Sequence, residues 1–260
     1  MQFYKMQALG NDFVIFGSPA QKTLPDRDFI KYLCNRHYGV GADCAIFIAE
    51  SKYADFFMHV YNPDGFEAEI CGNALRCSAK YVTEKGFFKK RNFVAETLSG
   101  MRSLSVTKNG IRAEIGTPKI ESNGNIEVCG VRFPYVSVSL GNPHCVIFVA
   151  GLRDDEFSFY GSQIENHPMF TNGTNVEFAV ITGSGKIAMR VWERGIGETL
   201  SCSTGSCACV AAAIEQGYNE DTFEVYQPGG VITVNCENNN MYITGECVSI
   251  FKGELIVNKR

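Results

Sequence analysis

The sequence has little of what marks several large classes of protein. It has one tryptophan in 260 residues and no apolar run long enough to cross a bilayer. Its start, MQFYKMQALGNDF, lacks the basic residues and apolar stretch of a secretory signal. A net charge of −4 gives no excess of positive charge for nucleic acid or an anionic membrane surface. We therefore expect a cytoplasmic protein with no nucleic-acid or membrane partner.

Cysteine, by contrast, is abundant. The eleven cysteines are odd in number and irregularly spaced, and no C-x-x-C occurs, which argues against a disulfide framework. The closest group is Cys202, Cys207 and Cys209, which would need ligands from elsewhere to hold zinc, so we expect no metal site. A free cysteine packs like a small hydrophobic residue. Most of the eleven are therefore expected in the core.

The residue patterns favour an α+β fold. Strands are expected over residues 55–61, 111–115, 136–140, 145–149, 186–192 and 231–234, and helices over residues 26–35, 72–85, 154–160 and 203–216. The last helix has no charge before Glu215 and almost no bulky side chain. A helix without a polar face must be enclosed by other structure. We expect sheets curled around central helices.

Two short internal similarities suggest a repeated half. Asn11-Asp12-Phe13 resembles Asn175-Val176-Glu177-Phe178, and a glutamate precedes a cysteine by four residues in both Glu67–Cys71 and Glu198–Cys202. The turn at Gly116-Thr117-Pro118 lies about midway along the chain and is the best candidate boundary. We expect two similar halves, each contributing one cysteine at the start of a helix.

The positions of Cys71 and Cys202 predict a specific chemistry. Each precedes an expected helix, where the helix dipole and N–H groups lower the pKa of a thiol and favour the thiolate. The same N–H groups can hold a carboxylate. They belong to Gly72, Asn73, Ser203 and Thr204. One thiolate would remove an α-proton and a thiol on the opposite face would return one, which predicts a racemase or epimerase of an amino acid.

Six motifs give the chain a resemblance to a known family. They are F-x-K-M and G-N-D-F near the start, N-x-D-G…C-G-N…R, G-N-P-H, N-V-E-F and E-R-G-x-G-E-T…C, which fall at Phe3–Met6, Gly10–Phe13, Asn62–Arg76, Gly141–His144, Asn175–Phe178 and Glu193–Cys202. In this order and over nearly the whole chain, they are similar to those of the diaminopimelate epimerase family.

The resemblance implies an isomerase that interconverts LL- and meso-2,6-diaminopimelate without a cofactor, in lysine and peptidoglycan biosynthesis. It also implies a homodimer. The implied fold has two pseudo-symmetric domains, each a curved, barrel-like mixed or antiparallel sheet around a central helix, with the active site in the cleft between them. The domains would comprise residues 1–116 with 249–260, and residues 117–248.

The resemblance also implies a role for each matched residue. Cys71 and Cys202 are the acid/base pair, and His144 and Glu193 tune their pKa values. The substrate would be bound by Asn11, Asn62, Gly72, Asn73, Asn142, Asn175, Glu193, Arg194, Ser203 and Thr204. Among these, the Arg194 guanidinium suits the second carboxylate of diaminopimelate, because its two N–H groups match a carboxylate in pairs.

Four positions depart from the family pattern. Cys44 stands where the family commonly has Gln or Gly, and Phe66 replaces a small hydroxyl residue. Ala74 and Ser203 each replace a Gly, but they keep the backbone N–H groups that would hold a carboxylate. Cys44 and Phe66 are therefore the two departures expected to alter the substrate pocket.

Three other functions remain open at this stage. A cofactor-independent racemase of histidine, lanthionine or a proline-like substrate would share the cysteine pair. A thiol hydrolase would pair one cysteine with His144 and leave the other dispensable. A catalytically silent ligand-binding protein of the same fold would show no proton exchange at all.

Overall fold

The computed structural model describes residues 1–151 and 153–256. The chain forms two compact units, which we call unit 1 (residues 1–114 and 244 onward) and unit 2 (residues 115–243). The expected domain boundaries follow residues 116 and 248, a little further along the chain than the boundaries of these units. They coincide with the last residue of one strand and the first residue of another. The first and last strands of the chain therefore belong to unit 1, and unit 2 is inserted between the last two strands of unit 1.

Unit 1 contains two helices, α1 (Arg27–Cys34) and α2 (Gly72–Glu84). Its strands are β1 (Gln2–Ala8), β2 (Asn11–Gly17), β3 (Cys44–Ala49), β4 (Phe56–Tyr61), β5 (Glu67–Ala68), β6 (Asn92–Thr97), β7 (Gly100–Thr107), β8 (Gly110–Gly116) and β18 (Val248–Glu254). Strand β8 runs two residues past the boundary between the units.

Unit 2 also contains two helices, α3 (Asp154–Glu165) and α4 (Ser203–Glu215). Its strands are β9 (Lys119–Val128), β10 (Val131–Ser139), β11 (Pro143–Phe148), β12 (Asn175–Gly183), β13 (Lys186–Glu193), β14 (Gly197–Thr199), β15 (Thr222–Gln227), β16 (Gly230–Glu237) and β17 (Asn240–Gly245). All of the expected strands and helices are present, with α3 longer than its pattern indicated.

The two units repeat one arrangement of strands. In unit 1, β2 pairs in parallel with β3 and antiparallel with β1, β4 pairs antiparallel with β3 and β5, and β6 pairs in parallel with β4. The same pairings occur in unit 2. There β11 pairs in parallel with β12 and antiparallel with β10, β13 pairs antiparallel with β12 and β14, and β15 pairs in parallel with β13. Even the outermost strand is matched, because β18 pairs antiparallel with β1 as β9 does with β10.

The register of these strands corrects one expected similarity. Phe13 pairs with Cys44 at the start of β2 and β3, and His144 pairs with Asn175 at the start of β11 and β12. Phe13 is therefore the counterpart of His144, and the G-N sequence before it matches that before His144, so the predicted match of Asn11 with Asn175 is wrong. Its physical basis was only the shared Asn and Phe, which occur on strands that are not equivalent.

The second expected similarity is confirmed by the register. Glu67 pairs with Tyr61 across β5 and β4, and Glu198 pairs with Trp192 across β14 and β13. Each of these short strands leads directly to a cysteine and a helix. Counterparts from β2 and β11 to α2 and α4 are all separated by the same number of residues along the chain.

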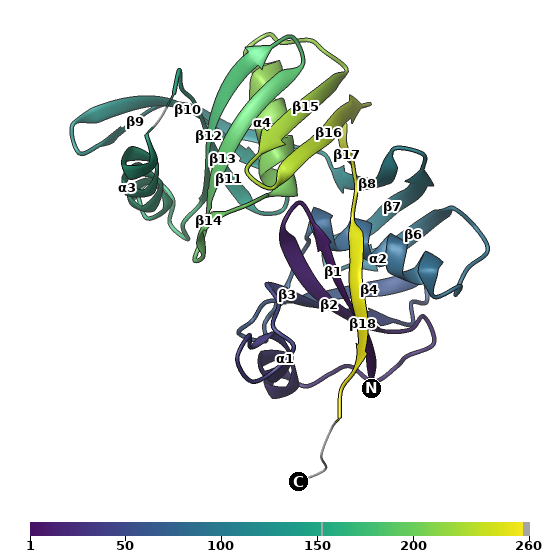
Figure 1. Ribbon diagram of the computed structural model, residues 1–260. Coiled ribbons are helices and arrows are strands. Elements are labelled where there is room, and N and C mark those ends of the chain that lie inside the picture. Colours follow the sequence, from purple (N-terminus) through teal and green to yellow (C-terminus); the bar gives the residue numbers. More distant parts are fainter. Residues whose placement is uncertain (152, 257–260) are drawn as a thin grey trace. The chain divides into compact units, whose positions relative to one another are not determined.

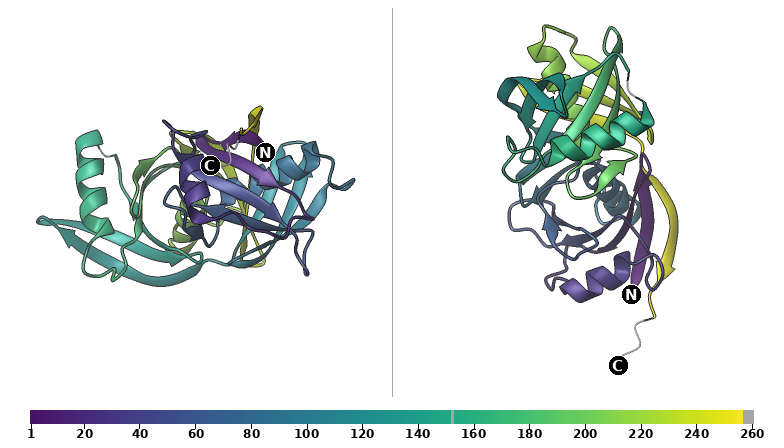
Figure 2. Two further views of the ribbon diagram at one scale, coloured as in Figure 1. Left: turned by 90° about the horizontal axis from the view of Figure 1, so that it is seen from below. Right: turned by 90° about the vertical axis from the view of Figure 1, so that its left-hand side faces the viewer.

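Each unit encloses one helix within its sheet, as Figures 1 and 2 show. Helix α2 contacts β1, β2, β3, β4 and β7, and α4 contacts β10, β11, β12, β13 and β16. Every residue of α4 from Ser203 to Ala213 is buried, as its lack of a polar face predicts. The expected α+β class is confirmed. The sheets are curved and mixed, but they do not close into barrels.

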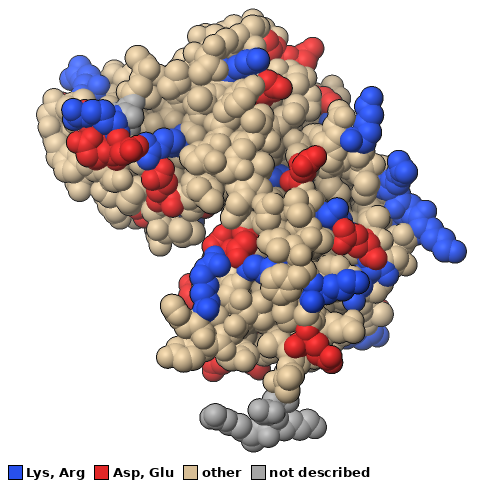
Figure 3. Space-filling view, viewed as in Figure 1, with Lys and Arg blue, Asp and Glu red and all other residues tan. Residues whose placement is uncertain are grey.

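Charged side chains lie mainly outside these enclosed helices. On the face shown in Figure 3, acidic and basic groups are interspersed. Several form ion pairs, such as Lys90 with Asp55 at 2.5 Å and Arg190 with Asp154 at 2.7 Å. Within the described residues, no helix is both long enough and apolar enough to traverse a bilayer.

Candidate active site

Cys71 caps the N-terminus of α2. Its backbone is extended (φ −144°, ψ 113°), and its Sγ accepts a hydrogen bond from the Ala74 N–H at 3.4 Å. Its carbonyl accepts the first helical bond, from the Leu75 N–H at 2.9 Å. The N–H groups of the first turn, including those of Gly72 and Asn73, point towards this end of the helix. The thiol thus lies where a carboxylate can bind.

Two asparagines lie beside the Cys71 thiol. The Asn11 Oδ1 is 3.9 Å from Cys71 Sγ and accepts a hydrogen bond from the Asn73 Nδ2 at 3.3 Å. The Asn73 Oδ1 in turn accepts from the Arg76 Nη2 at 2.6 Å, and Arg76 is completely buried. The structure therefore brings Asn11, Cys71 and Asn73 together, as the motifs predicted, and adds a buried cation beneath them.

A network of charged residues holds Asn11 in place, and sequence reasoning gave its members no role. The Asp43 Oδ2 accepts from the Asn11 Nδ2 at 3.1 Å, and Arg36 bridges Asp43 to Asp12 with contacts of 2.7 Å. Lys5 also donates to Asp12. Burial acts to raise the pKa of Asp12, but hydrogen bonds from Arg36 and Lys5 hold it well below its usual value. Lys5 and Asp12 lie inside the matched F-x-K-M and G-N-D-F motifs, which was the available signal.

Two of the three departures from the family pattern in unit 1, Cys44 and Phe66, lie in different surroundings. The Cys44 Sγ is 3.9 Å from the Asn62 Oδ1, so this position does adjoin a predicted binding residue. Phe66 is 57% exposed, and its ring stacks under the Arg27 guanidinium at 3.6 Å. Only the backbone of Phe66 contacts the site, where its carbonyl accepts from the Asn62 N–H at 2.9 Å.

Cys202 caps α4 in the same way as Cys71 caps α2. Its Sγ accepts from the Gly205 N–H at 3.3 Å and lies 3.4 Å from the Thr204 Oγ1. Its own N–H donates to the Gln227 Oε1 at 2.7 Å. Thr204 and Ser203 are buried in the first turn, so the second predicted cradle of N–H groups is also present.

The electrostatic surroundings of Cys202 differ from the expectation. Burial raises the pKa of the Cys202 thiol well above its usual value, and the Glu193 and Glu177 carboxylates raise it further. Hydrogen bonds from Thr204 and Gly205 oppose this shift without overcoming it. At Cys202 the expected lowering of the thiol pKa by the helix N-terminus is therefore outweighed, because desolvation is the larger effect. Glu193 does act on this thiol, as the resemblance implied.

His144 lies in a chain of polar contacts that leads to Cys202. Its Nδ1 is 2.7 Å from the Glu177 Oε1, and its Nε2 is 3.1 Å from the Asn142 Oδ1. The Asn142 Nδ2 donates to the Thr204 Oγ1 at 3.2 Å. His144 and Glu177 have no exposed side-chain surface. Sequence reasoning gave Glu177 no role, although it is the third residue of the matched N-V-E-F motif.

Two of the residues predicted to bind the far end of the substrate, Asn175 and Arg194, lie together at the start of β12 and just after β13. The Asn175 Oδ1 accepts from the Arg194 N–H at 3.0 Å, and its Nδ2 donates to the Pro143 carbonyl at 2.8 Å. Arg194 is exposed and, among the described residues, forms no salt bridge with a carboxylate. The neighbouring Glu193 accepts from the Thr199 hydroxyl at 2.5 Å.

The short strand before each cysteine is held by a pair of residues at equivalent positions. The His59 Nδ1 is 2.6 Å from the Glu67 Oε1 in unit 1, and the Arg190 Nη2 donates to the Glu198 Oε1 at 2.8 Å in unit 2. Both pairs link the long strand, β4 or β13, to the short one. They support the approach of the chain to Cys71 and Cys202.

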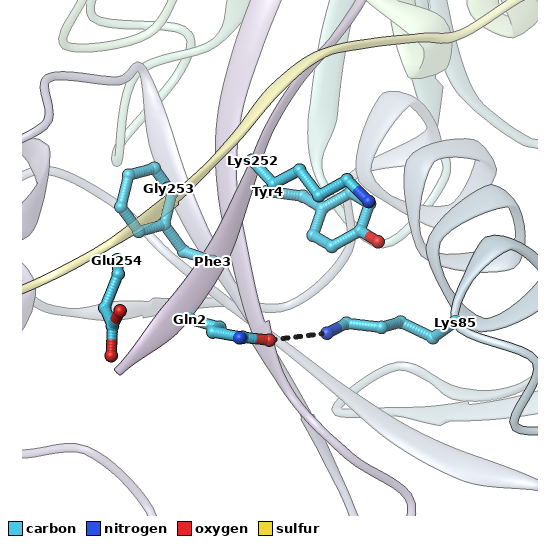
Figure 4. Close-up of a pocket in the computed structure, with 7 residues that line it drawn as sticks. All are labelled: Gln2, Phe3, Tyr4, Lys85, Lys252, Gly253 and Glu254. Atoms are coloured by element: carbon cyan, nitrogen blue, oxygen red, sulfur yellow. Dashed lines mark hydrogen bonds between the residues drawn. The ribbon is translucent and has the colours of Figure 1, made fainter.

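A separate hollow in unit 1 contains none of the predicted site residues. Figure 4 shows it where β1 and β18 pair, with Lys85 donating to the Gln2 Oε1 at 3.5 Å. Lys85 and Lys252 lie 5.1 and 5.9 Å from the centre of the Tyr4 ring. These contacts account for both lysines as groups packed over an aromatic face.

Solved structures define the fold class. The chain is similar to a probable proline racemase from Agrobacterium radiobacter (13% identity, TM-score 0.77, covering 99% of this chain and 93% of the other) and to a hydroxyproline epimerase from Agrobacterium vitis (15%, 0.76, 97% and 91%). It is also similar to a phenazine biosynthesis protein of the PhzF family from Bacillus anthracis (17%, 0.72, 99% and 99%). The two-unit fold is thus shared with racemases, epimerases and PhzF proteins.

Sequence comparisons identify the family. The model of the diaminopimelate epimerase family matches residues 3–121 and 136–250. Diaminopimelate epimerases from Carboxydothermus hydrogenoformans and Desulfitobacterium hafniense are 40% and 39% identical, over 98% of this chain and 99% and 98% of theirs. The chain belongs to the diaminopimelate epimerase family, as its motifs indicated.

Proposed function

We propose that the chain is a diaminopimelate epimerase, an isomerase that interconverts LL- and meso-2,6-diaminopimelate, and that Cys71 and Cys202 are its acid/base pair. Family membership over the full length supports the activity. The observation that carries the assignment of the pair is their equivalence. Each is the N-cap of an enclosed helix and accepts a hydrogen bond from the N–H three residues later.

The raised pKa of Cys202 supports one assignment of the starting roles in the proposed mechanism. Because burial favours its thiol, Cys202 begins as the acid and Cys71 as the base. Cys71 takes the α-proton from one face, Cys202 returns a proton to the other face, and the roles are exchanged in the reverse direction. Negative charge gathers on the α-carboxylate as the proton leaves. We propose that the first-turn N–H groups of α2 and α4 hold it.

The second amino-acid end of the substrate requires its own partners. We propose that the Arg194 guanidinium binds the distal carboxylate, because it is exposed and is not occupied by a carboxylate of the described chain. Asn62, Asn175 and Glu193 would bind the distal amino group and fix its orientation. Asn11 and Asn142, each beside one cysteine, would contact the reacting end.

The wider setting also forms part of the proposal. The reaction supplies meso-diaminopimelate to lysine and peptidoglycan biosynthesis, and we place the enzyme in the cytoplasm as a homodimer. No cofactor is needed, since two thiols and oriented N–H groups provide a base, an acid and charge stabilisation. Our support for the setting is the family resemblance.

Deuterium incorporation tests the function directly. The purified protein is incubated in D₂O with LL-diaminopimelate, L-histidine, lanthionine or L-proline, and the α-position is followed by NMR while chiral chromatography follows the epimers. We expect exchange and interconversion with diaminopimelate alone. Exchange with another amino acid in its place would contradict the substrate, and no exchange with any of the four would contradict the activity. Cys129→Ala, which removes an exposed thiol, is the matched control and should behave as wild type.

A further inference from the structure

The backbone of Cys202 is held on both sides of its Cα atom. On the C-terminal side, its carbonyl accepts hydrogen bonds from the Ser206 N–H at 3.0 Å and from the Ser206 Oγ at 2.8 Å, both within α4. On the N-terminal side, its N–H donates to the Gln227 Oε1 at 2.7 Å. Because both peptide groups are fixed, the direction of the Cα–Cβ bond is fixed too, and the sulfur is confined to a few staggered positions around it.

The bond to Gln227 takes the place of one that α4 does not make itself. A helix often protects the N–H of its N-cap with a Glu or Gln side chain at the third helical position, as in a capping box. In α4 that position is Gly205, where a Cβ would come within 2.6 Å of the buried Glu177 Oε1. A side chain there would collide with this carboxylate, so the acceptor for the Cys202 N–H has to come from another element.

The acceptor comes from the turn that joins β15 to β16, a strand packed against α4 (Figure 1). Gln227 is the last residue of β15 and pairs with Gly230, the first residue of β16. Between them, the Gly229 N–H donates to the Leu200 carbonyl at 2.8 Å. The turn thus holds the segment before α4 at two points, Leu200 and Cys202.

Gln227 is a buried polar residue with one paired end. It is 8% exposed, and its Nε2 has no hydrogen-bond partner among the described residues. Burying an unpaired donor lowers stability, and an apolar side chain of similar length would avoid that cost. The contact that accounts for a glutamine at this position is therefore the one from its Oε1 to the Cys202 N–H.

Unit 1 uses the equivalent turn differently. Thr97 is the counterpart of Gln227, because β6 pairs with β4 as β15 does with β13, and Thr97 pairs with Gly100 as Gln227 does with Gly230. The Thr97 Oγ1 donates to the Gly100 carbonyl at 2.8 Å and accepts from the Ser99 N–H at 3.2 Å. Both bonds stay inside the turn. The contact made by Gln227 is thus an addition of unit 2 and not a requirement of the repeated fold.

We propose that Gln227 is a positioning residue, whose amide oxygen fixes the backbone of Cys202 so that the sulfur faces the α-carbon of the substrate. The inference rests on the proposed function, in which Cys202 exchanges a proton with that carbon. Proton transfer requires the two atoms to be close and aligned, and a displacement of about 1 Å can slow such a step about 100-fold. Gln227 acts through the Cys202 backbone and needs no contact with the substrate.

Backbone amide exchange at Cys202 tests the contact itself. Protein labelled with ¹⁵N-cysteine is followed by NMR in wild type, Gln227→Met and Gln227→Glu, and the Cys202 signal is assigned by its absence from Cys202→Ala. Gln227→Met keeps the length of the side chain without the acceptor, whereas Gln227→Glu keeps an acceptor. We expect the Cys202 N–H to exchange about tenfold faster in Gln227→Met and at the wild-type rate in Gln227→Glu. Unchanged exchange in Gln227→Met would overturn the proposal.

Steady-state kinetics separate positioning from structural support. Thr97→Val is the matched control, because it removes a buried hydroxyl from the equivalent turn of unit 1. We expect Gln227→Met to lower kcat about tenfold with KM within about twofold of wild type, and Thr97→Val to leave both near wild type. If kcat falls no further in Gln227→Met than in Thr97→Val, or if only KM changes, the proposal is wrong.

A second variant keeps the test decisive if Gln227→Met does not fold. Gln227→Asn retains the amide but is one methylene shorter, so it should lose the bond to Cys202 and give the same changes in exchange and in kcat. Amide exchange needs no turnover. Failure of wild type in the deuterium experiment would therefore contradict the proposed function, whereas a protected Cys202 N–H in Gln227→Met or Gln227→Asn would contradict only the role of Gln227.

Discussion

The two units support equivalent cysteines with groups of opposite character. Beneath Cys71, the buried Arg76 donates to Asn73 at 2.6 Å, while Phe13 and Ile46 provide only apolar surface. Beneath Cys202, the buried Glu177 and His144 form the polar chain instead. The repeated backbone thus places each thiol at a helix N-terminus, whereas the buried side chains below the two thiols differ in charge. Similar geometry with different surroundings suits the proposed acid/base pair.

The largest expected effect is the loss of either thiol. Cys71→Ala and Cys202→Ala should each lower kcat/KM for epimerisation by about 10³-fold, because general acid or base catalysis at one face is lost. Interconversion is measured by chiral chromatography in both directions. Near-normal activity in one variant would mean that the two cysteines are not equivalent partners and would favour a single-thiol chemistry.

A matched pair of substitutions in the first turn of each helix should show the next largest difference. Gly205→Ala would bring a methyl group to 2.6 Å from the Glu177 carboxylate, and we expect it to lower the free energy of unfolding by about 2–3 kcal/mol. Its counterpart is Ala74, and Ala74→Gly should lower the free energy by only about 1 kcal/mol, from the flexibility of glycine. Urea denaturation followed by circular dichroism measures both. Equal losses would contradict the close approach of Glu177 to α4.

The loss of folding stability at acid pH should depend on Asp12, a partly buried carboxylate of unit 1. The pKa of Asp12 in the folded state lies below its unfolded value of 3.8. Its carboxylate therefore stabilises the fold above pH 3.8, and this stabilisation is lost as the pH falls towards the folded-state pKa. Asp12→Asn leaves Lys5 without its charged partner and should lower the free energy of unfolding by about 2 kcal/mol at pH 7. Denaturation between pH 2 and 7 should show a flatter acid limb than wild type. An unchanged slope would mean that Asp12 does not contribute to the loss of stability in acid.

The smallest effects are expected at the pairs that hold β5 and β14. Glu198→Gln weakens a partly exposed contact with Arg190 and should cost about 0.5 kcal/mol. Glu67→Gln weakens a more buried contact with His59 and should cost about 1 kcal/mol. Thermal unfolding ranks the two variants. The reverse order would show that burial does not decide which of the two contacts contributes more to stability.

The sequence was sufficient for the fold class and for the enclosed helices. The uniform apolar character of α4 can be satisfied only by burial, and the structure confirms it. Whether the sheets close into barrels could not be deduced from the sequence. A barrel requires a particular stagger between strands, and the alternation of side chains does not encode it.

The repeat was harder to place than the elements. The similarity of Glu67 with Glu198 has the same spacing as that of Cys71 with Cys202, whereas the expected match of Asn11 with Asn175 does not. Requiring one constant spacing would have selected Asn142 as the counterpart of Asn11. A short match of common residue types is weak by itself, and strand register confirms the candidate that the constant spacing selects.

Charge state was the least accessible property of the site. A cysteine before a helix predicts a lowered pKa, but the degree of burial depends on distant strands that enclose the helix. For the same reason, the roles of Asp43, Arg36 and Glu177 could not be read from local patterns. Their contacts join residues far apart in sequence, such as His144 with Glu177.

The strand that pairs with β1 at the outside of unit 1 is β18, the last strand of the chain. In unit 2, β9 precedes its partner β10, whereas β1 receives β18, and Met1 and Leu255 exchange backbone hydrogen bonds of 2.8 and 2.9 Å. If Leu255 were joined to Met1 and the chain reopened before β18, the protein would read as two uninterrupted tandem copies of one module. The order of the strands is thus that of a duplicated module in which β18 follows the second copy instead of preceding β1. An unfinished chain in synthesis cannot complete its first module until its last strand emerges.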